Sequence, residues 1–199
     1  MESQRKLTGL WLFSFLFLLA SPSLVFAHTG IGGVDGLWNG FSHPFGGLDH
    51  LCAMLGIGVW AAQRGGRSVW LVPLAFVVVM ALGGALGMMA VSVPFVERGI
   101  IASVLILGVL IAAAARLPLV LSVLIVGVFA LFHGHAHGAE MPTTASGFMY
   151  GIGFLAATAI LHLSGIGLGF IARQTSSTWL LRYAGAALVL CGVYLLLPH

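Results

Sequence analysis

Three histidines and one glutamate stand close together at the end of a long apolar run, in the stretch FHGHAHGAE at residues 132–140. His133 and His137 are four residues apart and Glu140 follows three residues later, so a continuing helix places all three on one face. His135 points elsewhere on such a helix. Imidazole nitrogens suit nickel, copper, zinc and iron, and a carboxylate offsets part of a cation's charge. The stretch therefore predicts ligands for a divalent metal ion.

A second cluster, HPFGGLDH at residues 43–50, opens another apolar run. On one helix, His43 and His50 are seven residues apart and share a face, with Met54 one turn further along. Asp49 stands beside His50, where a carboxylate can bind a metal or fix the tautomer of a ligating histidine. Titratable groups at membrane depth are costly, and a paired cluster of them predicts a functional site.

Two alternatives stay open for the stretch at residues 132–140. Gly134 and Gly138 weaken a helix and Pro142 follows, so a wrapped turn could bring the imidazoles together differently. The stretch could also be an exposed histidine-rich tract that gathers metal without transporting it. Its position at the end of an apolar run, with a counterpart at the start of another, argues against a purely peripheral role.

The composition is that of an all-α polytopic membrane protein. Hydrophobic residues make up 60% of the chain, charged residues only 7%, and the mean hydropathy is +1.10. A soluble domain cannot bury so much apolar surface. The basic residues are scattered singly and form no patch, which argues against nucleic acid as a partner. Cys52 and Cys191 lie in apolar runs without metal-binding spacing and are expected to act as small buried hydrophobes.

Residues 1–27 have the layout of a signal peptide: a basic start, an apolar stretch, and a small residue, Ala27, before the expected cleavage site. An uncleaved anchor helix is the alternative. Residues 28–42 are rich in glycine and polar side chains and are predicted to be an exposed lead-in. We therefore expect a signal peptide at 1–27 and a single transmembrane permease domain at 28–199.

Six apolar segments in this domain are near the ~20 residues that a membrane span requires. They lie at residues 44–62, 69–90, 95–115, 118–137, 146–171 and 179–197. Positive residues in short loops mark the cytoplasmic side, and arginines follow the first, third and fifth segments. This pattern predicts a multi-pass protein of the bacterial inner membrane with both mature termini, and both histidine clusters, on the periplasmic side.

His28 is a further candidate ligand. Cleavage after Ala27 would make it the first residue of the mature chain, where its free α-amine and its imidazole can chelate one ion together. The alternative is that a histidine is merely tolerated after the cleavage site.

The stretches HPFGGLDHLCAMLGIGVW at 43–60 and FHGHAHGAE at 132–140 resemble the two signature motifs of the HupE/UreJ family of hydrogenase and urease accessory proteins, regarded as nickel permeases. The resemblance implies six spans, nickel or cobalt as the transported ion, and hydrogenase or urease maturation proteins as partners. A homo-oligomer is compatible with it. His135 and Cys52 lie outside the metal-associated positions that the family implies, but His135 stays a candidate ligand as part of the histidine-rich stretch. The metal-associated positions that it implies are His43, Asp49, His50, His133, His137 and Glu140.

Other classes of protein fit the sequence less well than a permease does. The sequence His162-Leu163-Ser164-Gly165 lacks the first glycine of a GxSG serine-protease motif, and Ser164 falls far from the histidine clusters. No HExxH pair predicts a zinc protease, so we expect no enzyme. A metal-binding accessory or sensor protein that hands the ion to a partner stays open. So does a copper permease, because several methionines offer thioethers, although methionine also fills packing gaps.

Overall fold

The computed structural model describes residues 33–141, 146–174 and 178–197, and within these residues it contains helices and no strand. The predicted all-α fold is therefore confirmed. The expected signal peptide and His28 lie outside the described residues. The elements are α2 (Gly33–Ser42), the 3-10 helix η1 (His43–Phe45), α3 (Leu48–Arg64), α4 (Ser68–Met88), α5 (Val96–Ala112), α6 (Leu119–Ala139), α7 (Gly147–Gln174) and α8 (Thr178–Leu195).

The first apolar segment differs from its predicted form, because it does not begin as a helix at residue 44. The helix is interrupted at Gly46 and Gly47, and the backbone of Gly47 is extended, with φ −108° and ψ 125°. The axes of the helical segments before and after the break, Gly36–Phe45 and Leu48–Arg64, differ by 79°. His43 and His50 therefore belong to two differently directed elements and do not share the face of one helix.

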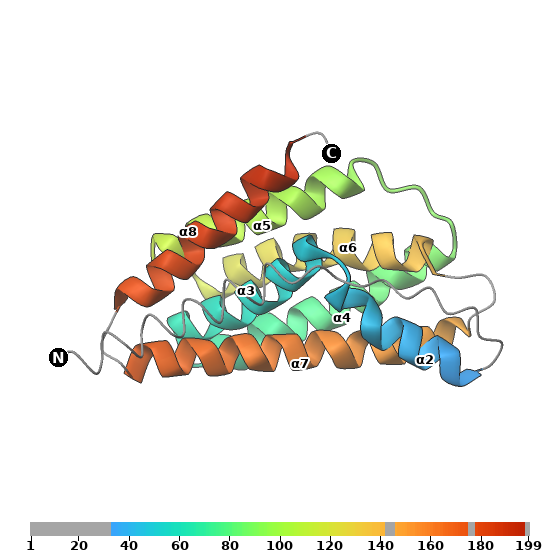
Figure 1. Ribbon diagram of the computed structural model, residues 1–199, viewed down its shortest axis with the longest axis horizontal. Helices are drawn as coiled ribbons and strands as arrows, with labels where there is room; N and C mark the ends of the chain where they lie inside the picture. Colours follow the sequence, from blue (N-terminus) through green and yellow to red (C-terminus); the bar gives the residue numbers. More distant parts are fainter. Residues whose placement is uncertain (1–32, 142–145, 175–177, 198–199) are drawn as a thin grey trace.

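The described part of the predicted lead-in is also not an exposed loop, since it forms α2. This helix packs against the first half of α7 (Figure 1). A Cβ atom added at Gly40 would meet the carbonyl oxygen of Tyr150, and one added at Gly153 would meet that of Leu37. Gly40, one of the glycines that suggested a loop, thus belongs to a close-packing surface between helices.

Helix α3 lies at the centre of the bundle. Every residue from Cys52 to Ala62 is buried, because α3 packs against α4, α5, α7 and α8. The most extensive pairings are α4 with α6, α3 with α7, and α5 with α8, and the last pair runs obliquely to the other helices (Figure 1). Bulky apolar side chains such as Trp70, Leu82 and Leu124 are exposed on the outside of the bundle.

Within the described residues, three helices are long and apolar enough to cross a membrane by themselves: α4, α6 and α7. The bent pair around Gly46 and Gly47 would make a fourth span if it is counted as one. Helices α5 and α8 are shorter, and α5 carries Glu97 and Arg98 in its first turn. A multi-pass membrane protein fits these helices.

The packing of α3 on α7 gives a test of the fold. Gly165→Ala places a methyl group against the carbonyl oxygen of Leu55, and the helices must separate to accommodate it. Overpacking of this kind costs about 1–3 kcal/mol, so we expect a lower midpoint of thermal unfolding in detergent. Gly151→Ala on the same helix is the matched control, because nothing lies within 4 Å of its added Cβ. Equal midpoints for the two variants would contradict this account.

Candidate metal centre

Both histidine clusters lie at one end of the bundle, which we call the histidine end. His43 is on η1, and Asp49 and His50 are in the first turn of α3. His133 and His137 are in the last turns of α6, and Glu140 caps it. Helix α6 runs unbroken to Ala139 despite its glycines, so the wrapped turn is not what forms.

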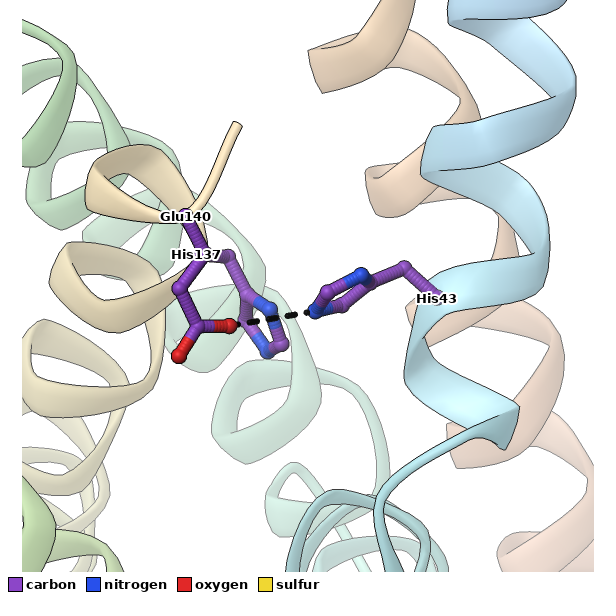
Figure 2. Close-up of side chains that lie close together, drawn as sticks. All are labelled: His43, His137 and Glu140. Atoms are coloured by element: carbon purple, nitrogen blue, oxygen red, sulfur yellow. Dashed lines mark ion pairs between the residues drawn. The ribbon is translucent and has the colours of Figure 1, made fainter. Parts of the chain in front are cut away.

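The outermost group consists of His43, His137 and Glu140, which point toward one another from η1 and α6 (Figure 2). One ligand atom from each lies within 4.8 Å of the others. The Nε2 atom of His43 is 3.5 Å from Oε2 of Glu140, and these side chains are 34% and 56% exposed. His137 is buried. The group is thus an accessible mouth with one buried wall, and its donor set suits a borderline divalent cation.

Behind this mouth the imidazoles continue into the bundle. The ring centroid of His50 lies 4.1 Å from that of His137 and 4.9 Å from that of His133. His43 lies 4.6 Å from His137 on the other side. His133 is 0% exposed. Four rings therefore form a continuous row from the surface to the core, in the spatial order His43, His137, His50 and His133. We call it the imidazole row.

Asp49 orients His50. Its Oδ1 accepts the backbone N–H of His50 at 2.8 Å and lies 2.7 Å from Nδ1 of the same ring. The carboxylate therefore favours the tautomer with hydrogen on Nδ1, which leaves the Nε2 lone pair of His50 available. That Nε2 atom is buried and has no hydrogen-bond partner among the described residues.

Ser103 of α5 orients His133 in the same way. Its hydroxyl donates to the carbonyl oxygen of Ile100 at 2.6 Å, so it accepts from Nε2 of His133, which is 2.8 Å away. The lone pair of His133 is then on Nδ1, a buried atom without a partner among the described residues. Both ring nitrogens of His137 are also buried and have no hydrogen-bond partner among the described residues. Buried polar atoms without partners are uncommon and costly, and here they converge.

The structure brings together six of the eight sequence-predicted site residues. His28 lies outside the described residues. His135 is turned away from the imidazole row, because its Nε2 atom lies 2.7 Å from the carbonyl oxygen of Val91, beyond the end of α4. The six that converge are His43, Asp49, His50, His133, His137 and Glu140.

Sequence reasoning missed the residues that hold these rings in place. Phe154 packs on His137 with ring centroids 4.0 Å apart, and Ser103 contacts His133. Aromatic residues are frequent throughout the apolar segments, so nothing in the pattern distinguishes Phe154 from a lipid-facing residue. A serine within an apolar run, such as Ser103, was the one available signal. Ser164, considered for a protease, donates to the carbonyl oxygen of Ile160 on its own helix.

The described residues form helices without strands, several of membrane length, and place a row of histidines at one end. These features define a membrane protein with a candidate metal centre. The sequence model described as "HupE / UreJ protein" matches residues 16–195. Protein HupE of Rhizobium leguminosarum bv. viciae is 46% identical over 181 residues, which cover 91% of this chain and 94% of that relative. The chain belongs to the HupE/UreJ family. No solved structure matches it.

The role of Asp49 can be tested by equilibrium binding. Asp49→Asn keeps the shape and a hydrogen-bond acceptor but removes the charge that orients His50. Loss of such a partner usually weakens metal affinity about 10–100-fold, and we expect that range for Ni²⁺ by calorimetry on the purified protein in lipid nanodiscs. Glu97→Gln, an exposed carboxylate on α5, is the control and should bind as wild type does. An Asp49→Asn variant with unchanged affinity would show that His50 needs no such partner.

Proposed function

We propose that this protein carries nickel, with cobalt as the second candidate cation, inward across the bacterial inner membrane. The family is one of hydrogenase and urease accessory proteins associated with nickel and cobalt transport. The observation that carries the proposal is the imidazole row, which begins at a half-exposed His43 and ends at a fully buried His133. A protein that only captured metal would not need a row of ligands that leads from its surface into its core.

The chemistry of the row fits such a cargo. Neutral imidazoles bind borderline cations such as Ni²⁺ and Co²⁺ well. A dication that leaves water also requires compensating charge. Glu140 supplies a carboxylate at the mouth and Asp49 supplies one beside His50. The row thus has a carboxylate beside His43, its first ring, and another beside His50, its third ring.

The proposed orientation places the histidine end outside. The opposite end of the bundle gathers arginines: Arg64 donates to the carbonyl oxygen of Leu117 at 2.6 Å, and Arg173 donates to that of Ala62 at 2.8 Å. Positive residues at membrane boundaries favour the cytoplasmic side. With six spans after a cleaved signal peptide at 1–27, both mature termini are periplasmic. The 17 residues of α5 give about 26 Å at 1.5 Å per residue, close to a bilayer's apolar thickness.

Transport can be driven by the membrane potential, which gives ~2.3 kcal/mol per positive charge per 100 mV. The protein then supplies metal to hydrogenase or urease maturation proteins in the cytoplasm.

Proteoliposomes loaded with a fluorescent nickel chelator separate this function from simple binding. A permease gives accumulation inside that rises with an inside-negative potential. An accessory binding protein gives bound metal in proportion to protein and no internal signal, and that result would refute the proposal.

His137 and His135 form a matched pair for uptake measurements. His137 contacts both His43 and His50 and has two unpaired ring nitrogens, whereas His135 is turned away. We expect His137→Ala to lower the initial rate of radioactive nickel uptake at least tenfold in cells. His135→Ala should retain at least half of the wild-type rate at equal membrane expression. A larger loss in His135→Ala than in His137→Ala would mean that the row is not the path.

A further inference from the structure

A second group of candidate ligands begins one helical turn beyond His50, away from the histidine end. Thr158 of α7 is the centre of this group. Its hydroxyl donates to the carbonyl oxygen of Phe154 on its own helix at 2.9 Å, and its Oγ1 lies 3.4 Å from Sδ of Met54 and 3.9 Å from Sδ of Met80. Met54 is on α3, four residues after His50, and Met80 is on α4. All three side chains are fully buried. Three helices thus bring two thioethers to one hydroxyl.

His162 lies one turn further along α7 than Thr158, on the same helix face. It is buried, and neither of its ring nitrogens has a hydrogen-bond partner among the described residues. A histidine kept only for packing would be expected to donate or accept at least one hydrogen bond. The His162 imidazole is therefore a further buried group without a hydrogen-bond partner, and it does not belong to the imidazole row.

Phe76 lies between the two sets of nitrogens. Its ring centroid is 5.9 Å from that of His133 and 5.1 Å from that of His162. Phe76 and Met80 are one turn apart on α4, as Thr158 and His162 are on α7. The two helices therefore face each other in register, with Met80 against Thr158 and Phe76 against His162. Phe76 thus separates the deepest ring of the row from His162, and Met80 lies one turn from Phe76 toward the histidine end.

We propose that Met54, Met80 and His162 form an inner binding site for the transported cation, a proposal that rests on the proposed function. Thioether and imidazole ligands suit a borderline or soft cation and disfavour hard ones such as Mg²⁺ or Ca²⁺. Asp49, Glu97 and Glu140, the acidic residues whose side chains the structure describes, lie at the ends of α3, α5 and α6 and not among these three residues. Without a carboxylate, the inner site binds a dication more weakly than the mouth does, and conduction needs sites weak enough for the ion to leave.

X-ray absorption at the nickel edge tests this site directly. The full chain in lipid nanodiscs, loaded with two equivalents of Ni²⁺, should show a sulfur shell in addition to nitrogen and oxygen. Met54→Leu combined with Met80→Leu nearly preserves packing volume and should remove that shell, while the affinity for the first equivalent stays within about twofold. Met89→Leu is the matched control, because Met89 is 73% exposed. A wild-type protein without sulfur scattering, or a double variant that retains it, overturns the proposal.

Uptake into proteoliposomes then tests whether the site lies on the transport path. We expect the double methionine variant and His162→Ala each to lower the initial rate at least tenfold, with Met89→Leu unchanged. Rates within twofold of wild type in both would remove the site from the path. Failure of the proposed function is distinguishable: wild-type liposomes would then accumulate no nickel, while the sulfur shell would still report whether the inner site exists.

Discussion

The break at Gly46 and Gly47 is the constraint on which the candidate site depends. On one straight helix, two residues seven apart are separated by about 10.5 Å along the axis, too far for both to bind one ion. The 79° change of direction lets His43 and His50 approach the same ring of His137, at 4.6 and 4.1 Å. The glycines thus convert a spacing along the chain into a convergence in space.

The buried nitrogens of the row must be held in place against a considerable cost. Each unsatisfied buried group costs about 1–3 kcal/mol, which the surrounding packing has to offset. Close contacts between helices provide that support. A Cβ at Gly134 of α6 would meet the carbonyl oxygen of Met80, so α6 is seated directly on α4 next to His133. Stability elsewhere in the bundle permits a polar centre that would not form by itself.

Much of this arrangement could be predicted from the sequence. Six apolar segments, each corresponding to one of α3 to α8, follow from hydropathy, and the two histidine clusters stand out because charged and titratable residues are so few. Which residues of the clusters meet could not be predicted, because His43 and His50 converge through a backbone break. Gly46 and Gly47 signalled it, but paired glycines also occur within helices, as at Gly83 and Gly84 in α4.

The helix α2 and the inner binding site could not be predicted from the sequence, for different reasons. Glycine-rich sequence favours loops in water, whereas between membrane helices it favours close contact, so the residues before His43 gave a misleading pattern. Met54 and Met80 resemble any methionine that fills a core. Only the distances to Thr158 distinguish them, and these depend on the register of three helices, which periodicity does not fix.

The spacing of the imidazole row has a consequence for the water carried by an ion. Neighbouring rings lie 4.1–4.9 Å apart, which leaves no room for a cation that keeps its full hydration shell. An ion that moved along the row as proposed would therefore exchange its waters for nitrogens, step by step. Mg²⁺ dehydrates reluctantly and gains little from nitrogen ligands. The row would then select against Mg²⁺, the commonest cellular dication, because Mg²⁺ keeps its waters. It would admit rarer cations that exchange water for imidazole readily.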